Sequence, residues 1–499
     1  MHPGGIADKV GNRYEALWLI RHLLELIDGR AHAIMIEPVG DAGIGVEFAV
    51  ERGNGTEWHQ AKRQTSSSWT IPRLASEGVL ATFQGKLAAS GSNSCVFVST
   101  DPAKPLRLLK DKQPTAANPD AFERTLSEAE QTEWQKLQQS LGLNKSESFA
   151  WLERCDFFTY PERELGAAIV AECDRWFAAD PEAVIDTLRR WVEDDHNFNR
   201  PLRRQELLDT LSARTIALKQ YEIDRTIPGK IEAANRHYDE SYRPIGAGLF
   251  DIDRAEVDVL TAALADPEGP KVIALAGPAG SGKSVIVRKA LERIDPDRPA
   301  LVFRIDQVGG IASLAALGEA TIEVSDSPAV VLEQLAGRAV LFIDQADAVS
   351  EMSGRTATVR NVLLRMLRQA RFYPDLQVVF SCRSFDLDND HEFRAIARAP
   401  HALRIDIGPL RWTEDVLPVL VKLGIGIQGA GTKVQALLCQ PIGLALVADL
   451  ASTAPLELAH VEHIGQLYDA LLAMRDAELR KIAQPGWSLY EALTALAEA

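Results

Sequence analysis

The chain has 499 residues, and 54 lysines and arginines against 70 aspartates and glutamates give it a formal net charge of −16. With 46% hydrophobic and 25% charged residues it has the composition of a folded protein, which excludes disordered and collagen-like chains. The acidic balance excludes a protein that coats nucleic acid through bulk charge, so any such contact must come from a local patch. The length predicts about three domains.

The cysteines and the apolar segments indicate the compartment. The five cysteines lie far apart and form no CxxC pair, which argues against a disulfide framework and against a zinc site. The amino-terminal residues lack the apolar stretch of a signal peptide, and no apolar run approaches the ~18 residues of a membrane helix. We therefore expect a soluble, cytoplasmic protein without a membrane partner.

Residues 1–100 mix helices with short apolar strands, in the predicted order α-β-β-β-α-β. Apolar residues recur at helical spacing over residues 14–27 and again over 71–88. Short runs bounded by glycine, aspartate or asparagine predict strands at 33–36, 45–50, 56–62 and 95–98.

The rest of the chain divides into three further segments. Residues 101–245 carry amphipathic helical patterns punctuated by prolines, which predict a helical connector. Residues 246–410 alternate strands with helices, which is typical of a parallel α/β domain, and residues 411–499 are purely helical in pattern. The strands predicted in the α/β segment are 272–276, 300–305, 339–343 and 376–381.

A glycine-rich loop follows the first of these strands. The octapeptide GPAGSGKS at 277–284 has the form GxxxxGK[ST] between an apolar strand and a helix, which is the context that this motif requires. Glycines let successive backbone N–H groups turn inward and form an anion site at the positive end of the helix. Lys283 would then reach the β- and γ-phosphates of ATP, and the Ser284 hydroxyl would ligate Mg²⁺. The predicted nucleotide-binding residues of the loop are Gly277, Gly280, Ser281, Gly282, Lys283 and Ser284.

Two later strands of this domain end in residues that suit the same site. Asp344 ends a buried strand and is expected to hold the Mg²⁺ of the nucleotide together with Ser284. Gln345 stands where an acid that activates water is usual, with Asp347 two residues further on. Because an amide is a poor proton acceptor, we expect slow hydrolysis. Arg383 follows another strand and is a candidate contact of the γ-phosphate, with an ordinary surface arginine as the alternative.

Residues 246–499 resemble the STAND class of AAA+-related signalling ATPases, through the phosphate-binding loop, Asp344 and the tripeptide at 381–383. Residues 437–444, LLCQPIGL, look like the helical-domain motif of that class, whose proline, here Pro441, packs near the adenine. The resemblance implies that ATP binding opens the protein and drives it into a homo-oligomer.

Two of the amino-terminal strands bring an acid and a base to one face. Strict alternation along 56–62 puts Gln60 and Lys62 on the same face of the strand. In the preceding strand the apolar residues share the other face and leave Glu47 opposite them. If the two strands pair as a hairpin across 53–55, Glu47 approaches both Gln60 and Lys62.

This acid, the QxK pair and the strand order together resemble the PD-(D/E)xK nuclease family, which implies a restriction-endonuclease-like domain. More narrowly, they look like the nuclease domain fused to antiviral STAND proteins. The resemblance covers about the first hundred residues, and its matching positions are Gly11, Asn12, Arg13, Tyr14, Glu15, Glu37, Asp41, Glu47, Gln60 and Lys62.

Phosphodiester hydrolysis has a task for each of these residues. A divalent cation held by carboxylates neutralises charge on the phosphate and lowers the pKa of the attacking water. Glu47 is the expected main Mg²⁺ ligand, and either Glu15 or Glu37 the second. Gln60 would offer its carbonyl oxygen where relatives often have glutamate, and Lys62 would orient the hydroxide or stabilise the pentacovalent phosphate.

Together these features predict an ATP-gated, Mg²⁺-dependent endonuclease of double-stranded DNA in prokaryotic antiphage defence, started by a phage-derived trigger. Oligomerisation would turn the weak DNA affinity of an acidic monomer into strong multivalent binding. One alternative is a STAND scaffold whose amino-terminal domain binds DNA or a partner without cleaving, with Glu47 and Lys62 as a solvated ion pair. Another is an ATP-driven DNA translocase, which needs the brisk hydrolysis that Gln345 disfavours.

Overall fold

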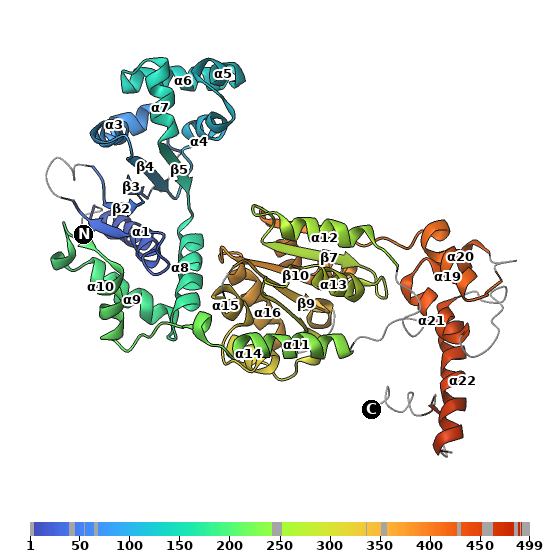
Figure 1. Cartoon of the computed structure of the whole chain (residues 1–499). Coiled ribbons are helices and arrows are strands. Elements are labelled where there is room, and N and C mark those ends of the chain that lie inside the picture. The colour runs from blue at the N-terminus through green and yellow to red at the C-terminus, as the bar shows by residue number, and fades with distance from the viewer. Residues whose placement is uncertain are drawn as a thin grey trace. The chain divides into compact units, whose positions relative to one another are not determined.

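The computed structural model describes residues 4–38, 45–53, 55–63, 68–241, 252–335, 337–350, 357–426, 431–451, 463–483, 488, 489 and 491. The chain divides into two compact units, Met1–Lys219 and Gln220–Ala499 (Figure 1). Asp41 lies outside the described residues, and of Gly11 and Asn12 only the helical backbone is described.

The described part of the first unit is built around a six-stranded mixed sheet. Its order is β5-β4-β3-β2-β1-β6, with β1, β2 and β3 antiparallel and with β4 and β5 parallel to β3. The strands are β1 (Ala33–Ile36), β2 (Phe48–Arg52), β3 (Gly55–Lys62), β4 (Ser94–Ser99), β5 (Cys155–Thr159) and β6 (Pro201–Leu202).

Helices cover both faces of this sheet, because alternate residues of its strands serve two separate cores. In β4, Val96 and Val98 pack into one core, whereas Cys95 and Phe97 pack into the other. The first core is closed by α1 (Gly4–Leu24), α8 (Glu162–Trp176), α9 (Pro181–Val192) and α10 (Arg204–Ser212). The second is closed by α2 (Ile71–Ser76), α3 (Val79–Ala89), α4 (Lys104–Lys112), α5 (Pro119–Thr125), α6 (Glu128–Leu141) and α7 (Lys145–Glu153).

The first unit extends far beyond the boundary that the sequence predicts at residue 100. β5 pairs with β4 and β6 pairs with β1, so most of the segment expected as a helical connector completes the first sheet and its two cores. β5 is five residues long and β6 is two, and both lie between helices. Strands this short leave no extended apolar pattern in the sequence, so they were not predicted. The helix expected over 71–88 is two helices, since Gly78 between them has a φ of 79°.

The second unit contains a parallel α/β sheet, as the sequence predicts. Its order is β11-β7-β10-β9-β8, with the glycine-rich loop following the second strand in this order and Asp344 ending the fourth. The strands are β7 (Val272–Gly277), β8 (Ala300–Arg304), β9 (Ala339–Asp344), β10 (Leu376–Arg383) and β11 (Ala402–Asp406). Only β11, a half-exposed edge strand, was not expected from the sequence.

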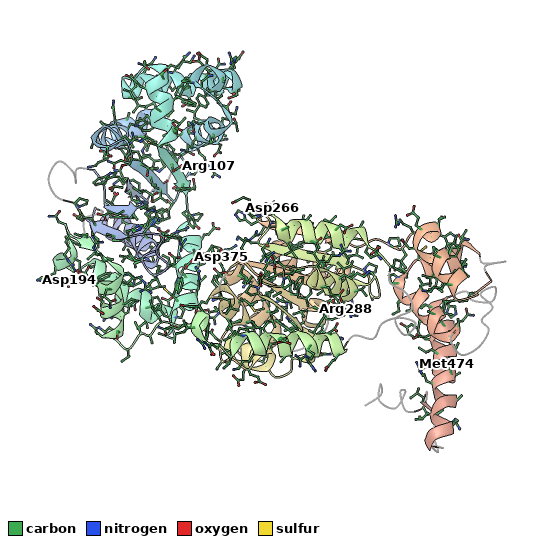
Figure 2. All side chains as sticks on the ribbon, viewed as in Figure 1. Arg107, Asp194, Asp266, Arg288, Asp375 and Met474 are labelled. Carbon is green, nitrogen blue, oxygen red and sulfur yellow. The ribbon has the colours of Figure 1, made fainter. Side chains whose placement is uncertain are left out.

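Helices fill the two faces of this sheet, and side chains occupy the space between the layers (Figure 2). The helices around the sheet are α11 (Ile227–Ser241), α12 (Ala255–Ala265), α13 (Lys283–Glu292), α14 (Leu314–Ile322), α15 (Pro328–Glu333), α16 (Ala357–Ala370), α17 (Ser384–Asn389) and α18 (His391–Ala397). A helical part with its own core follows, containing α19 (Leu417–Lys422), α20 (Thr432–Leu438), α21 (Pro441–Ala451) and α22 (Ile464–Ala483).

Among the described residues no single helix combines the length and the apolar character that a membrane crossing needs. The short helices α20 and α21 reach that threshold only when taken together, and they are bent by 94° at the break between them.

Candidate functional sites

One end of the strands β1, β2 and β3 gathers the polar residues that the sequence singles out. The pairing of β2 with β3 ends at Phe48 and His59, and the backbone N–H of Glu47, just before β2, donates to the carbonyl oxygen of the same His59 at 3.0 Å. Glu37 comes directly after β1, and its backbone N–H donates to the carbonyl oxygen of Glu47 at 2.9 Å. The predicted hairpin therefore forms, and it brings Glu47 to the end of β3 that carries Gln60 and Lys62.

Glu47 and Lys62 are in direct contact at this end of the sheet. The Lys62 ammonium donates to Oε1 of Glu47 at 3.1 Å, and the backbone N–H of Ala61 donates to Oε2 at 3.0 Å. Even so, burial raises the pKa of Glu47 to about 7, and the nearby Glu15 carboxylate adds to the rise while Lys62 opposes it. The ion pair with Lys62 therefore does not offset the cost of burying the Glu47 carboxylate.

Glu15 belongs to the same electrostatic cluster, although it comes from α1. Its pKa is raised by burial, lowered by Lys62 and raised again by Glu37. Glu15 and Glu37, the two candidates for a second metal ligand, thus lie close enough to interact electrostatically with each other, and Glu15 also interacts with Lys62. The structure thus brings Glu15, Glu37, Glu47 and Lys62 together, and Gln60 lies two residues before Lys62 on β3.

Gln60, two residues before Lys62 on β3, has an unusual environment. Its side chain is 4% exposed, and its Oε1 finds no hydrogen-bond partner in the described part of the chain. A buried carbonyl oxygen without a partner is costly, by about 1–3 kcal/mol. An oxygen-preferring cation such as Mg²⁺ would satisfy it, and carboxylate and amide oxygens are the ligands that Mg²⁺ takes. The residues present therefore fit the metal.

The raised pKa of Glu47 gives a testable pH dependence of stability. Between pH 4.5 and about 7 the folded protein retains a proton that the unfolded chain has released, so metal-free stability falls as pH rises through this window. The loss is up to about 3 kcal/mol. Urea unfolding in EDTA should show that the free energy of unfolding of Glu47→Gln, relative to wild type, rises by this amount from pH 4.5 to 7. An equal pH dependence in both proteins would contradict the assignment.

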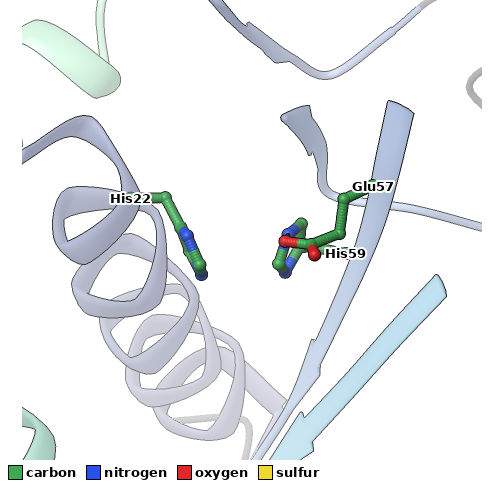
Figure 3. A group of neighbouring side chains, drawn as sticks. All are labelled: His22, Glu57 and His59. Atoms are coloured by element: carbon green, nitrogen blue, oxygen red, sulfur yellow. Dashed lines mark hydrogen bonds and ion pairs between the residues drawn. The ribbon is translucent and has the colours of Figure 1, made fainter. Parts of the chain in front are cut away.

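A second polar cluster lies on the opposite face of the same sheet (Figure 3). Ligand atoms of His22, Glu57 and His59 lie within 4.8 Å of one another. The Nδ1 of His59 accepts a hydrogen bond from the indole of Trp18 at 3.1 Å, so the ring proton is on Nε2, which donates to Glu57 at 2.8 Å. Arg52 donates to Glu57 as well. Because both nitrogens of His59 are used and a guanidinium lies alongside, the cluster holds α1 against β3 and does not suit a metal ion.

The second unit contains the predicted phosphate-binding loop between β7 and α13. Gly280 and Gly282 have φ angles of 72° and 92°, which glycine adopts without strain. The Lys283 ammonium folds back onto the loop and donates to the carbonyl oxygens of Gly277 and Pro278, both at 3.0 Å. Ser281 is 1% exposed, and among the described residues its hydroxyl has no partner. The glycine conformations and the contacts of Lys283 thus agree with the loop that the sequence predicts.

Asp344 is fully buried at the end of β9, next to this loop. Its Oδ1 accepts from the Ser381 hydroxyl and from the backbone N–H of Gln345, and its Oδ2 accepts from the Tyr238 hydroxyl at 3.0 Å. The amide of Gln345 is 3.5 Å from the Ser284 hydroxyl, which places both predicted Mg²⁺ ligands on one side of the loop. Tyr238 was missed from the sequence because no motif marks it.

Asp347 also faces the nucleotide loop. Gln345 has a φ of 63°, and this left-handed turn swings the chain so that Asp347 is 5% exposed and interacts electrostatically with Lys283. Asp347 forms an ion pair with Arg383 at 2.9 Å, and burial raises its pKa. Arg383 thus ends β10 beside Gly277, the first residue of the loop, and its guanidinium is paired with a carboxylate.

The helical part contacts the loop through the start of α21. The backbone N–H of Ile442 donates to the carbonyl oxygen of Gly280 at 3.1 Å. A Cβ placed on Gly282 would be 3.7 Å from Pro441, so this proline lies next to the P-loop.

The packing of α21 on the loop can be tested with a glycine pair. A Cβ on Gly280 would come within 2.6 Å of Ile442, whereas Gly310 has nearly the same φ, 71°, and open space around it. Both alanine variants should lose about 1–2 kcal/mol from the left-handed backbone, and Gly280→Ala should lose a further 1–3 kcal/mol through overpacking. Urea unfolding measures the difference. Equal losses in the two variants would show that α21 is not seated on the loop.

No protein-family model matches this sequence, and a search of curated proteins also found no match. Among solved structures, a Walker-type ATPase of Pyrococcus abyssi is similar over 48% of this chain and 78% of its own, with 13% identity and a TM-score of 0.33. The Cap4 SAVED/CARF-domain receptor of Acinetobacter baumannii, with a cyclic trinucleotide, is similar over 62% of this chain and 64% of its own, with 12% identity and a TM-score of 0.28. Scores this low do not assign a function.

Proposed function

We propose that the chain is an ATP-gated, Mg²⁺-dependent endonuclease of double-stranded DNA that acts in prokaryotic antiphage defence. The observation that carries the proposal is the contact of Glu47 with Lys62 at 3.1 Å, together with the buried carbonyl oxygen of Gln60, two residues before Lys62, which has no hydrogen-bond partner among the described residues. A cross-strand ion pair on a solvated face would not need that buried oxygen or the second and third carboxylates nearby.

The first unit would hold the nuclease site. Glu47 and Gln60 would bind Mg²⁺, with Glu15 or Glu37 as a further ligand. When bound, the metal supplies a positive charge at the scissile phosphate and lowers the pKa of the attacking water. Glu47 must be ionised to act as a ligand, and its ion pair with Lys62 favours that form. Lys62 would then donate its hydrogen bonds to the attacking water or to the phosphate oxygens.

The second unit would bind ATP and Mg²⁺ and act as the gate. Lys283 would leave the loop carbonyls for the β- and γ-phosphates, while Ser284 and Asp344 hold the metal. The buried Asp347, which interacts electrostatically with Lys283, could accept a proton from water, and its ion pair with Arg383 must open before Arg383 reaches the γ-phosphate. Lys283 has to leave the loop carbonyls and Arg383 has to leave Asp347, and both steps favour slow hydrolysis, which suits a switch.

ATP-driven oligomerisation, started by a phage-derived trigger, would then gather several copies of the first unit on DNA. The net charge of −16 opposes DNA binding by one copy. Several linked sites raise the overall affinity by orders of magnitude without any new contact. We therefore propose that assembly of the oligomer controls DNA cleavage.

The test is plasmid cleavage with ATP and Mg²⁺ by the wild type, Lys62→Ala and Lys283→Ala. Only the wild type should cut, and Lys283→Ala should also fail to oligomerise. ATP-dependent oligomers that never nick DNA with any divalent metal would instead support a signalling scaffold whose first unit binds DNA or a partner.

A further inference from the structure

α11 is hydrogen-bonded to an edge strand of the sheet in the second unit. β8 is this edge strand of the sheet, and the side chain of Asn235 forms hydrogen bonds with the backbone of β8, as a neighbouring strand would. Its amide donates to the carbonyl oxygen of Ala300 and its Oδ1 accepts from the N–H of Val302, both at 2.8 Å. An ion pair of 2.7 Å between Arg288 of α13 (labelled in Figure 2) and Asp239 adds a second attachment. α11 therefore has a defined position beside the nucleotide loop.

Tyr238, also on α11, reaches from this position into the site. Its ring is 5% exposed and packs into the core of the sheet domain. Its hydroxyl donates to Oδ2 of Asp344 at 3.0 Å and lies 3.4 Å from the backbone oxygen of Ser284. One hydroxyl thus touches both elements that would hold the metal of the nucleotide.

The contact fixes how the Asp344 carboxylate is turned. Oδ1 is engaged by Ser381 and by a backbone N–H, so a donor on Oδ2 sets the rotation of the whole group. A fully buried carboxylate needs such donors to satisfy its oxygen atoms. Partners behind a metal ligand orient it, and removing one typically costs 10–100-fold in metal affinity.

We propose that Tyr238 is a positioning residue for the Mg²⁺·nucleotide site, and that α11 is in turn stabilised when Mg²⁺ and nucleotide bind. The inference rests on the proposed nucleotide binding and adds a regulated element to it. α11 begins eight residues after Lys219, the last residue of the first unit. The contact of Tyr238 therefore makes the helix that follows the proposed nuclease unit in the sequence sensitive to nucleotide. Because such coupling is reciprocal, whatever holds α11 in place also strengthens metal binding.

The test compares Tyr238→Phe with Tyr221→Phe in the full chain. Tyr221 makes a similar hydrogen bond, to Asp326 at 2.8 Å, outside the nucleotide site. The dissociation constant of a fluorescent ATP analogue is measured in EDTA and in Mg²⁺. We expect Tyr238→Phe to reduce the tightening by Mg²⁺ about 10-fold while binding in EDTA stays within about twofold. Tyr221→Phe should behave as the wild type.

Hydrogen exchange of the α11 amides gives a second readout, independent of activity. Mg²⁺ and ATP together should slow this exchange in the wild type and in Tyr221→Phe, but not in Tyr238→Phe. An unchanged Mg²⁺ effect in Tyr238→Phe, or equal weakening with and without metal, would overturn the inference and leave the proposed nucleotide site intact. A wild type that binds no nucleotide would overturn the proposed site and this inference with it.

Discussion

Glu47→Gln is expected to abolish DNA cleavage, with a loss of about 1000-fold or more. A metal at the phosphate supplies several kcal/mol of transition-state stabilisation, and each 1.36 kcal/mol is a tenfold change in rate. Glutamine keeps the size of the side chain and an acceptor for the Ala61 N–H, but it removes the charge that holds the cation and pairs with Lys62. Plasmid nicking with ATP and a titration of Mg²⁺ measures the loss.

The matched control is Glu51→Gln, which changes an exposed carboxylate on β2, the strand that directly follows Glu47. It should cut at the wild-type rate. Cutting by Glu47→Gln within about threefold of the wild type would remove Glu47 from the site, whatever the effect of the control.

Lys283→Ala should weaken nucleotide binding by about 100-fold and abolish ATP-dependent assembly and cutting. Charge-assisted hydrogen bonds are worth about 1.5–3 kcal/mol, and each 1.4 kcal/mol is tenfold in affinity. The ammonium is 6% exposed and at present bonded only to loop carbonyls among its described contacts, so it is available to phosphate without breaking an ion pair. Titration with a fluorescent nucleotide and light scattering report both effects.

Lys289→Ala serves as the control on the same helix, because its ammonium donates to the carbonyl oxygen of Ile252, away from the loop. Its nucleotide affinity should match that of the wild type. DNA cutting that persists in Lys283→Ala would show that the nuclease is not gated by ATP.

Local patterns in the sequence were enough to predict the contact of Glu47 with Lys62 and the strand, loop and helix around Lys283. Alternation along β3 and a short hairpin set the face of Lys62 and the approach of Glu47, because register in a tight hairpin is fixed by the turn. The P-loop was predicted from strand, glycines and helix in one continuous segment. In each case residues close in the chain determine the geometry.

Long-range pairing could not be predicted in the same way. β5 joins the first sheet about 55 residues after β4, and no pattern within its five residues shows which strand it will pair with. The contact of Tyr238 with Asp344 joins residues 106 positions apart, and a tyrosine in an amphipathic helix looks like ordinary core. The raised pKa of Glu47 likewise depends on burial and on Glu15, which only the folded chain brings near.

The most direct test of the nuclease site is to locate its metal. Crystals of the full chain soaked in Mn²⁺ should show an anomalous peak about 2.1 Å from a carboxylate oxygen of Glu47 and from Oε1 of Gln60, with Lys62 alongside. Crystals that bind Mn²⁺ elsewhere, with no peak between Glu47 and Gln60, would contradict the account.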